Sequence, residues 1–376
     1  MAKPNTETSS PTKQSNTLSK SKVAAVYATP STVMADIARV MELADYNSYL
    51  NQQIDTLLKI NLSWQYYYPA CSTTPWQLEG VINTLSASGF NNLIAAHNGT
   101  VVVDSLEGEI RNKQKPVQEK YGLHSVHLDI PPNEWIPFEP KSDMLVLDKI
   151  FPEGLTIPAI FPGKNIVHLP TMKTHVFTTM TGAMKNAFGG LLNRKRHWTH
   201  SMIHETLVDL LAIQKEIHPG IFAVMDGTFA GDGPGPRAMR WHQKNLFLAS
   251  ADQVAIDAVA AKLMGFDPMS IKFIRLAHER GLGCGDISQI EVVGEDISDV
   301  NWHFEGTQNT LASRGQKLIY WGPLKPLENI LLRSPIAPWS FFASNLYHNS
   351  YWLRFIGQRR IEAAMKTSWG QLFQQY

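Results

Sequence analysis

Cysteine is scarce in this 376-residue sequence, which contains only Cys71 and Cys284. Two distant cysteines argue against a disulfide framework and match a reducing compartment, so we expect a cytoplasmic protein. Two thiolates are also too few for one four-thiolate cluster, which excludes an iron–sulfur centre built by this chain alone.

The sequence also lacks an excess of charge and any long apolar run. Its formal net charge is +1, with 34 Lys and Arg against 33 Asp and Glu. A neutral chain offers no electrostatic reason to bind nucleic acid. No stretch reaches eighteen uninterrupted apolar residues, so no transmembrane helix is expected. The first residues lack the apolar segment of a secretory signal.

Residues 1–22 are almost entirely Ser, Thr, Asn, Gln, Lys and Pro. Such a composition buries too little apolar surface to offset the entropy of ordering, so we expect a disordered N-terminal arm. A cleaved targeting peptide is the alternative, although Glu7 and the absence of Arg weigh against it.

From residue 23 onward, short apolar runs alternate with amphipathic stretches. This rhythm predicts an α/β fold with a mostly parallel sheet and helices on both faces. The expected helices cover residues 31–43, 75–85, 203–217 and 252–264. The expected strands cover residues 23–27, 56–62, 92–96, 125–129, 144–147, 164–169, 221–225, 245–249 and 290–293.

Polar side chains gather where several of these strands end. Lys59 and Asn61 close the second strand, and Lys173 and His175 follow the strand that Pro170 stops. Because the carboxyl ends of parallel strands meet at one edge of a sheet, we expect these residues to line one pocket. Lys185 and Asn186 follow a small-residue turn, where backbone amides near Thr181 and Gly182 would help to bind a carboxylate or phosphate.

Asp226 and Gly233 belong to the second half of this predicted pocket. Asp226 is expected at the end of the strand 221–225, followed by the Gly/Pro-rich loop GTFAGDGPGP at residues 227–236. A carboxylate at a strand end suits a metal ion or proton transfer, and Gly233 would let a ligand approach the backbone. An ordinary wide turn is the alternative interpretation of this loop.

Three histidines, His197, His200 and His204, have the spacing of one helical face. Imidazoles suit zinc, nickel or iron, with Asp226 as a carboxylate ligand. The alternative is a half-solvated helix with scattered histidines, and of the three we favour His200 as a metal ligand. His168 lies inside an apolar strand and is expected to be a core residue.

The motifs K-T-H at 173–175, T-G-A-M-K-N-A-F-G-G at 181–190, a later His, D-G-T at 226–228 and G-D-G-P-G-P at 231–236 occur in the order typical of the DUF362 family. The chain resembles this family from about Val23 to Val293, which implies a DUF362-like α/β domain over residues 23–300. Many relatives carry ferredoxin-like segments with iron–sulfur clusters. The resemblance therefore implies that this chain could work together with a separate iron–sulfur protein.

His175 and Lys185, ten positions apart around a Thr-Gly-Ala segment, also resemble the His and Lys of the nickel-pincer lactate racemase family. In that family the lysine tethers a pyridinium cofactor and a later histidine binds nickel. The resemblance implies a tether at Lys185 and a metal ligand at His200, but a second proton-moving histidine has no match in this sequence.

Residues 301–376 form an aromatic and basic C-terminal extension. Three interpretations of this extension are open: it packs back over the sheet domain, it forms a contact between copies of the chain, or it lies on a membrane surface.

These observations predict an enzyme that acts on a small anionic, carboxylate-type substrate or cofactor by acid–base or metal-assisted chemistry. The lysines and asparagines (Lys59, Asn61, Lys173, Lys185, Asn186) would bind the anion, with Lys185 as a charge clamp or a nucleophile. His175 would transfer protons, and Asp226 with His200 would hold a divalent transition metal or orient the base. A non-catalytic redox or assembly partner of an iron–sulfur protein is the alternative. The reaction class stays open between isomerisation and redox chemistry.

Overall fold

The computed structural model describes residues 20–99, 103–306, 308–333 and 345–376. Most of the N-terminal arm expected at residues 1–22 lies outside these ranges. Its last two residues belong instead to the first strand, which begins at Ser21 and pairs with a strand near residue 290.

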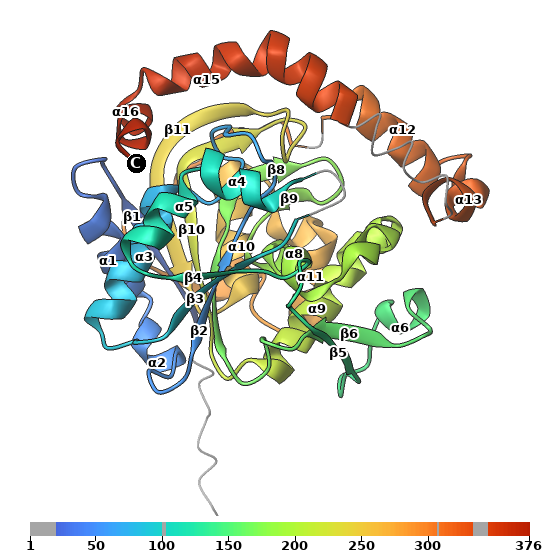
Figure 1. Cartoon of the computed structure of the whole chain (residues 1–376), viewed down its shortest axis with the longest axis horizontal. Coiled ribbons are helices and arrows are strands. Elements are labelled where there is room, and N and C mark those ends of the chain that lie inside the picture. The colour runs from blue at the N-terminus through green and yellow to red at the C-terminus, as the bar shows by residue number, and fades with distance from the viewer. Residues whose placement is uncertain (1–19, 100–102, 307, 334–344) are drawn as a thin grey trace, which may run out of the picture.

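A large mixed sheet runs through the centre of the domain (Figure 1). Its strands, in the order in which they lie side by side, are β12 (Ile290–Gly294), β1 (Ser21–Tyr27), β11 (Arg240–Ser250), β10 (Ile221–Asp232), β7 (Asn165–Leu169), β2 (Thr56–Ile60), β3 (Leu93–His97) and β4 (His124–His127). The pairs around β7, β2, β3 and β4 are parallel, whereas β11 is antiparallel to both β1 and β10. The expected α/β class with a mostly parallel sheet is confirmed.

Helices cover both faces of this sheet. One face carries α1 (Val33–Leu43), α2 (Tyr46–Tyr49) and α3 (Pro75–Ala87), and the other carries α7 (Ala183–Asn186), α8 (Phe188–Leu191), α9 (Ile203–Ile217), α10 (Gln253–Met264) and α11 (Lys272–Glu279). Alternate residues of β1 serve the two cores: Val23 and Ala25 face one, and Ala24 and Val26 the other. This alternation follows from the two-residue period of a strand.

Several short elements border the sheet. They are α4 (Ser105–Arg111), α5 (Gln114–Lys120), α6 (Leu147–Ile150), the hairpin of β5 (Trp135–Phe138) and β6 (Leu155–Pro158), and the 3₁₀ segment η1 (Arg194–Met202). The prediction of a strand at residues 144–147 is wrong. The Asp209 carboxylate accepts the backbone N–H groups of Leu145, Val146 and Leu147 at 2.8–3.1 Å, and the chain turns there into α6.

Pro170 ends β7 as expected, and a second strand, β8 (Thr171–His175), begins directly after it. β8 pairs with the far half of β10 and with β9 (Thr179–Thr181). The strand expected to end at Met225 in fact continues to Asp232, since β8 on one side and β11 on the other satisfy its backbone. Asp226 therefore lies within a strand and not at its end.

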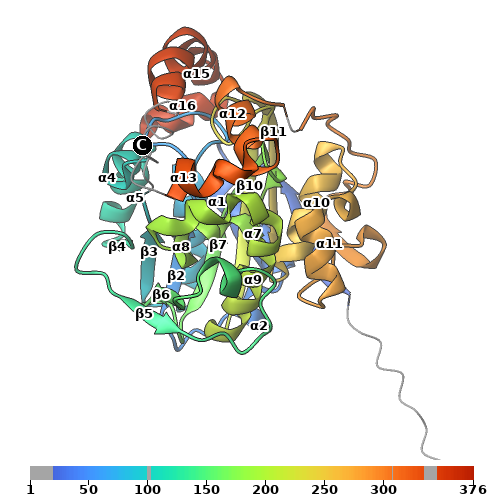
Figure 2. The same ribbon diagram turned by 90° about the vertical axis from the view of Figure 1, so that its right-hand side faces the viewer.

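The C-terminal extension forms an arc of helices over the domain, at the edge where the parallel strands end (Figures 1 and 2). Its elements are α12 (Leu311–Tyr320), η4 (Lys325–Leu327), α13 (Glu328–Arg333), the π-helix η5 (Leu346–Gly357), α15 (Gln358–Met365) and α16 (Ser368–Gln375). α16 is anchored firmly: Trp369 Nε1 donates to Asn245 Oδ1 at 2.8 Å, and the Phe373 ring stacks on Tyr67. The described part of the extension thus packs on the sheet domain.

Candidate functional site

A cavity of about 630 Å³ lies at the carboxyl edge of the sheet, and Ser313, Gln316 and Tyr320 of the C-terminal arc contribute to its wall. This volume lies in the range of sites for small organic ligands. Its wall includes Lys59, Asn61, His175, Lys185, Asn186 and His200, six of the residues singled out from the sequence. The loops after β2, β8 and β10 thus meet as the parallel topology predicts.

Lys59 projects from the end of β2, is 2% exposed, and donates from Nζ to Ile60 O at 2.7 Å. Gly190 permits this position, because a Cβ there would lie 2.7 Å from Lys59 Cε. Burial, reinforced by the positive charge of Arg196, lowers the pKa of Lys59 to about 7. The Gly189-Gly190 pair therefore makes room for a lysine whose charge is poorly compensated.

Lys185, in α7, reaches the same cavity and lies 5.1 Å from the centre of the Phe188 ring. Burial, together with the positive charges of Lys173 and Arg196, lowers its pKa to about 7. A lysine with this pKa is close to half neutral at neutral pH. It can therefore serve as a cation, a base or a nucleophile.

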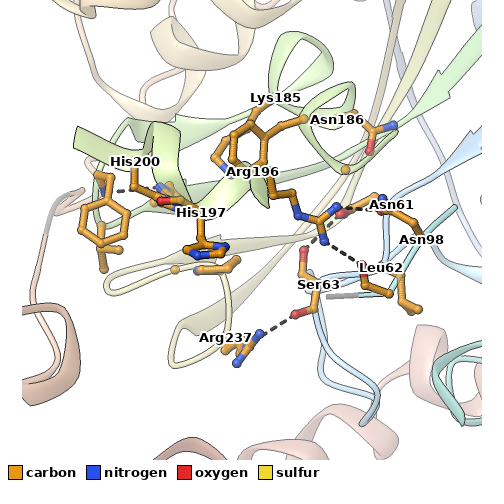
Figure 3. Close-up of a pocket in the computed structure, with 18 of the residues that line it drawn as sticks. Asn61, Leu62, Ser63, Asn98, Lys185, Asn186, Arg196, His197, His200 and Arg237 are labelled. Carbon is orange, nitrogen blue, oxygen red and sulfur yellow. Dashed lines mark hydrogen bonds between the residues drawn. The ribbon is translucent and has the colours of Figure 1, made fainter. Parts of the chain in front are cut away.

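Two arginines complete the cationic wall, and the sequence-based reasoning missed both as site residues. Arg196 donates to Asn98 Oδ1 at 2.9 Å and to Gly99 O at 2.7 Å, and burial lowers its pKa to about 10. Arg237 follows the GPGP turn directly and donates from Nε to Ser63 O at 3.0 Å. Figure 3 shows Lys185, Arg196 and Arg237 entering the cavity from separate segments.

Lining residues carry an unequal balance of charge. Lys59, Lys185, Lys195, Arg196 and Arg237 are basic, and Asp129 is the one acidic residue among the lining residues that the structure describes. Lys195 is exposed and pairs with Glu153 at 3.0 Å, so the other four cations carry the imbalance. Low-dielectric surroundings make such an imbalance costly unless an anion is bound.

Two of the histidines that line the cavity, His175 and His200, differ in tautomer. Phe177 N–H donates to His175 Nδ1 at 3.2 Å, so neutral His175 carries its proton on Nε2. His200 Nδ1 lies 3.1 Å from His197 O, which can only accept, so the free lone pair of His200 is on Nε2. Burial lowers the pKa of both rings, that of His200 to about 3. Of these two imidazoles, His175 thus offers a donor and His200 an acceptor.

Asn61 and Asn186 fix the shape of this wall. Asn186 Nδ2 donates to Lys59 O at 2.8 Å, and Asn61 Nδ2 donates to Thr171 Oγ1 at 3.1 Å. His168 is buried in the core, with Nε2 2.6 Å from Gln214 Oε1, as expected for a satisfied core residue.

Lys173, Asp226 and Gly233 do not line the cavity. Lys173 is 1% exposed, and its Nζ donates to Cys71 O at 2.8 Å and to Thr171 Oγ1 at 2.5 Å. Gly233, with φ of 102°, lies one residue before the lining segment 234–237 and accepts a hydrogen bond from Thr174 Oγ1 on its carbonyl. The prediction that all these residues share one pocket is therefore wrong for these three positions.

Asp226 is held away from His200 by its own partners. Its carboxylate accepts hydrogen bonds from Thr74 Oγ1 at 2.5 Å, Trp76 Nε1 at 3.1 Å and Thr228 N at 2.6 Å, in a fully buried setting between β10 and α3. Burial raises the pKa of this carboxyl. The structure therefore does not bring Asp226 and His200 together as a metal-binding pair.

The expected anion site at the start of α7 is also occupied. Asp257 of α10 accepts the N–H groups of Ala183 at 2.6 Å and Met184 at 3.1 Å. The helix end is thus satisfied by a carboxylate of the protein itself, and a ligand must be held by side chains.

The trio His197, His200 and His204 does not share one helical face, because η1 ends and α9 begins between His200 and His204. His197 and His200 line the cavity, whereas the His204 ring stacks on Phe273. Among described residues, a separate group, His97, Glu109 and His127, places ligand-type atoms within 4.8 Å of one another. There Glu109 already accepts hydrogen bonds from His97, Gln118 and Ser125.

Comparison with known proteins assigns this chain to a family. The model of the DUF362 family, described as a domain of unknown function, matches residues 56–262. The chain belongs to the DUF362 family. The matched range includes Lys59, His175, Lys185, Arg196, His200 and Arg237, and it excludes the C-terminal arc.

A thylakoid-associated protein of the cyanobacterium Synechocystis is 30% identical over 124 residues. The match covers 31% of this chain and 37% of that relative. No solved structure matches this DUF362 protein significantly. Among described residues, no helix is long and apolar enough to cross a membrane.

Proposed function

We propose that this DUF362 protein is an enzyme whose cavity binds a small organic ligand with two or more negative charges. The observation that carries the proposal is the charge balance of the wall: besides the exposed Lys195, which pairs with Glu153, four cations face one acid among the described lining residues. A carboxylate or phosphate ligand would compensate these cations, and phosphate and carboxylate are the groups that Arg and Lys bind best.

The ligand also has an organic part. Trp135, Phe177, Phe188 and Tyr320 contribute aromatic surface to the wall, and the Tyr320 ring lies parallel to His200. A cavity of about 630 Å³ with aromatic and cationic walls suits a carbon skeleton bearing acidic groups better than a bare inorganic ion.

His175 and His200 supply acid–base chemistry in this proposal. His175 would donate the proton on Nε2 and His200 would accept one on its free Nε2, so a proton could leave one atom of the ligand and arrive at another. A bound anion would raise the pKa of His200 from about 3 toward the working range, because it offsets the nearby positive charges.

Lys185 would either clamp an acidic group or attack a carbonyl carbon. In the second case the neutral amine adds to the carbonyl, one water leaves, and an imine joins the ligand to Nζ. The pKa of about 7 makes the neutral amine available near neutral pH.

Intact mass spectrometry after borohydride treatment tests these two roles. If Lys185 forms an imine, the wild type gains a stable mass that the Lys185→Arg variant lacks. If Lys185 is a clamp, no adduct forms and Lys185→Arg keeps part of its affinity, because the charge remains. Wild-type ligand binding by Lys185→Ala would contradict both roles.

A metal at His200 is an additional proposal, and His197 lines the same cavity. A non-catalytic partner of an iron–sulfur protein is the alternative function. The cysteines support this alternative. The chain has only two, and burial raises the pKa of the Cys71 thiol, so an iron–sulfur cluster would be bound by the partner protein. Metal analysis of protein purified without air separates these options: bound metal favours the enzyme, and capture of a ferredoxin by metal-free protein favours the partner role.

We also propose that the protein is peripherally associated with a membrane. The name of the Synechocystis relative supports this location. Contact between copies through the C-terminal arc is the competing proposal. Flotation of wild-type protein with lipid vesicles tests the association.

A further inference from the structure

The helices of the C-terminal arc leave large apolar side chains in solvent. In and around α12 and α13, Leu318, Trp321, Leu324, Leu327 and Ile330 are between 39% and 55% exposed. In η5, Leu346, Tyr351 and Phe355 are between 54% and 58% exposed. We name these eight side chains the arc patch.

The exposure is not a sign of poorly packed helices. The same helices bury other side chains: Ile319 and Tyr320 of α12 are 3% and 4% exposed, and Trp352 of η5 is 4% exposed. Trp352 packs on Trp64 and Tyr68, with ring centres 6.1 and 5.2 Å away. Each helix is therefore anchored by one apolar side and presents a second one to solvent.

Three aromatic side chains of η5 form a row that leads from Tyr347, partly buried against the cluster of Trp64 and Trp352, to the exposed Tyr351 and Phe355. The ring centres of Tyr347 and Tyr351 are 6.1 Å apart, and those of Tyr351 and Phe355 are 5.6 Å apart. Tyr and Phe in such a row suit the boundary between lipid headgroups and acyl chains.

The charge of the arc favours an anionic partner. Between residues 306 and 361 the sequence has seven Lys and Arg and a single acidic residue, Glu328. Glu328 is 8% exposed and accepts a hydrogen bond from Ser201 Oγ. Arg314, Lys325 and Arg354 are exposed beside the arc patch. Lysine is depleted at protein interfaces, whereas Lys and Arg around apolar residues are typical of membrane-surface helices.

We infer that the arc patch is a docking surface for an anionic membrane. The inference rests on the peripheral association proposed above and specifies the face of the molecule that makes it. The opposite side of α12 lines the cavity through Ser313, Gln316 and Tyr320. Docking through the arc would therefore hold the ligand cavity close to the membrane surface.

Vesicle sedimentation tests the inference with full-length protein. Wild type should bind vesicles that contain an anionic phospholipid and bind zwitterionic vesicles weakly. Trp321→Ser with Tyr351→Ser and Phe355→Ser should weaken binding at least about tenfold, because three aromatic side chains no longer enter the interface. Lys325→Glu with Arg354→Glu should weaken vesicle binding by more than about fivefold. Fivefold is about the loss expected from removing a single basic charge, and this variant reverses two.

Tyr49→Ser is the matched control. Tyr49 is 50% exposed and belongs to α2, on the side of the domain far from the arc (Figure 1). This variant should bind vesicles like wild type. Circular dichroism and thermal unfolding verify that every variant is folded.

Two results overturn the inference and have different meanings. If wild type binds neither kind of vesicle, the proposed membrane association itself is wrong, and a loss of dimers in the aromatic variant would assign the patch to a second copy. If wild type binds but the arc variants bind equally well, the association holds and the docking face is elsewhere. Ligand binding by the cavity is measured without lipid and is independent of both results.

Discussion

Two parts of this molecule bury charge in opposite ways. Beside α7 and α3, the buried carboxylates Asp257 and Asp226 are surrounded by donors that the fold supplies: two backbone amides for the first, and Thr74, Trp76 and Thr228 for the second. In the cavity, several cations come together and face mainly carbonyl and amide oxygens. The first arrangement gives each carboxylate donors from the fold itself, whereas the second places several positive charges together.

This difference separates structural charges from functional ones better than residue type does. From the sequence, a carboxylate after an apolar run and a lysine after an apolar run are equally attractive as site residues. Burial shifts the pKa in both regions: it raises that of Asp257 to about 7 and lowers those of Lys59 and Lys185 to about 7. The neighbours differ: hydrogen-bond donors surround Asp226 and Asp257, whereas the positive charge of Arg196 adds to the effect of burial at both lysines. The predictions below test this distinction.

The largest expected effect is on stability and arises at Gly182, which lies beside the buried carboxylate of Asp257. A Cβ at this residue would lie 2.0 Å from Asp257 Oδ1, which would push the carboxylate away from the two amides it accepts. Gly182→Ala should lower the free energy of unfolding by about 3 kcal/mol or more, since buried groups lose their partners. Urea denaturation measures the change.

Gly315→Ala is the control for this variant. Nothing lies within 4 Å of a Cβ at Gly315, in helix α12, so the substitution should be neutral or stabilise by up to about 1 kcal/mol. A loss of less than about 1 kcal/mol for Gly182→Ala would show that Asp257 is not needed at the start of α7.

The next effect concerns Lys59 and pH. Its pKa in the folded protein is about 7, below the ordinary value of 10.5. Below pH 7 both folded and unfolded states carry the proton, and the cost of burying the charge is complete. Between these two pKa values the unfolded state binds more protons, so stability rises with pH, by at most about 1.4 kcal/mol per pH unit.

Lys59→Met removes this dependence. The variant should be more stable than wild type at about pH 7, and its advantage should shrink by about 2 kcal/mol by about pH 9. Urea denaturation of ligand-free protein across this range measures both curves. If the stabilities of wild type and variant change with pH in parallel, Lys59 keeps an ordinary pKa and burial in the cavity does not disfavour its charge.

The smallest effect on binding is expected at Asp226. Asp226→Asn keeps the shape of the side chain but removes the charge between β10 and α3. It should cost about 1–2 kcal/mol of stability, because hydrogen bonds to a charged acceptor weaken. Ligand affinity should stay within about twofold of wild type, which isothermal titration can verify. A tenfold loss of affinity in a fully folded variant would return Asp226 to the site.

Much of the fold was predictable because local patterns and tertiary packing agree. Helix 203–217 has the predicted bounds, and Thr74, before Pro75, caps α3. The exceptions arise where distant residues compete for the backbone. Asp209 converts the expected strand at residues 144–147 into a turn, and β8 with β11 extends β10 through a Gly-rich segment that resembles a loop.

The site was predictable only in part. Parallel topology brings Lys59, His175 and Lys185 together, as the strand-end argument predicts. Arg196 and Arg237 could not be assigned, because nothing local distinguishes a buried arginine in a basic loop from an exposed one. A signal existed for Arg237, which directly follows the Gly-Pro-Gly-Pro turn. The cavity wall supplied by Tyr320 was unpredictable, since it depends on how the C-terminal arc packs.

Anion-dependent stabilisation tests the central claim most directly. Thermal unfolding of wild type and of Lys59→Met with Arg196→Met is followed at constant ionic strength in increasing pyrophosphate or citrate. Wild type should gain stability that saturates, reaching about 2.7 kcal/mol at a hundredfold excess over Kd, and the double variant should gain none. An equal response of both proteins, or no response of wild type to either anion, would contradict the claim that the cavity exists to hold an anionic ligand.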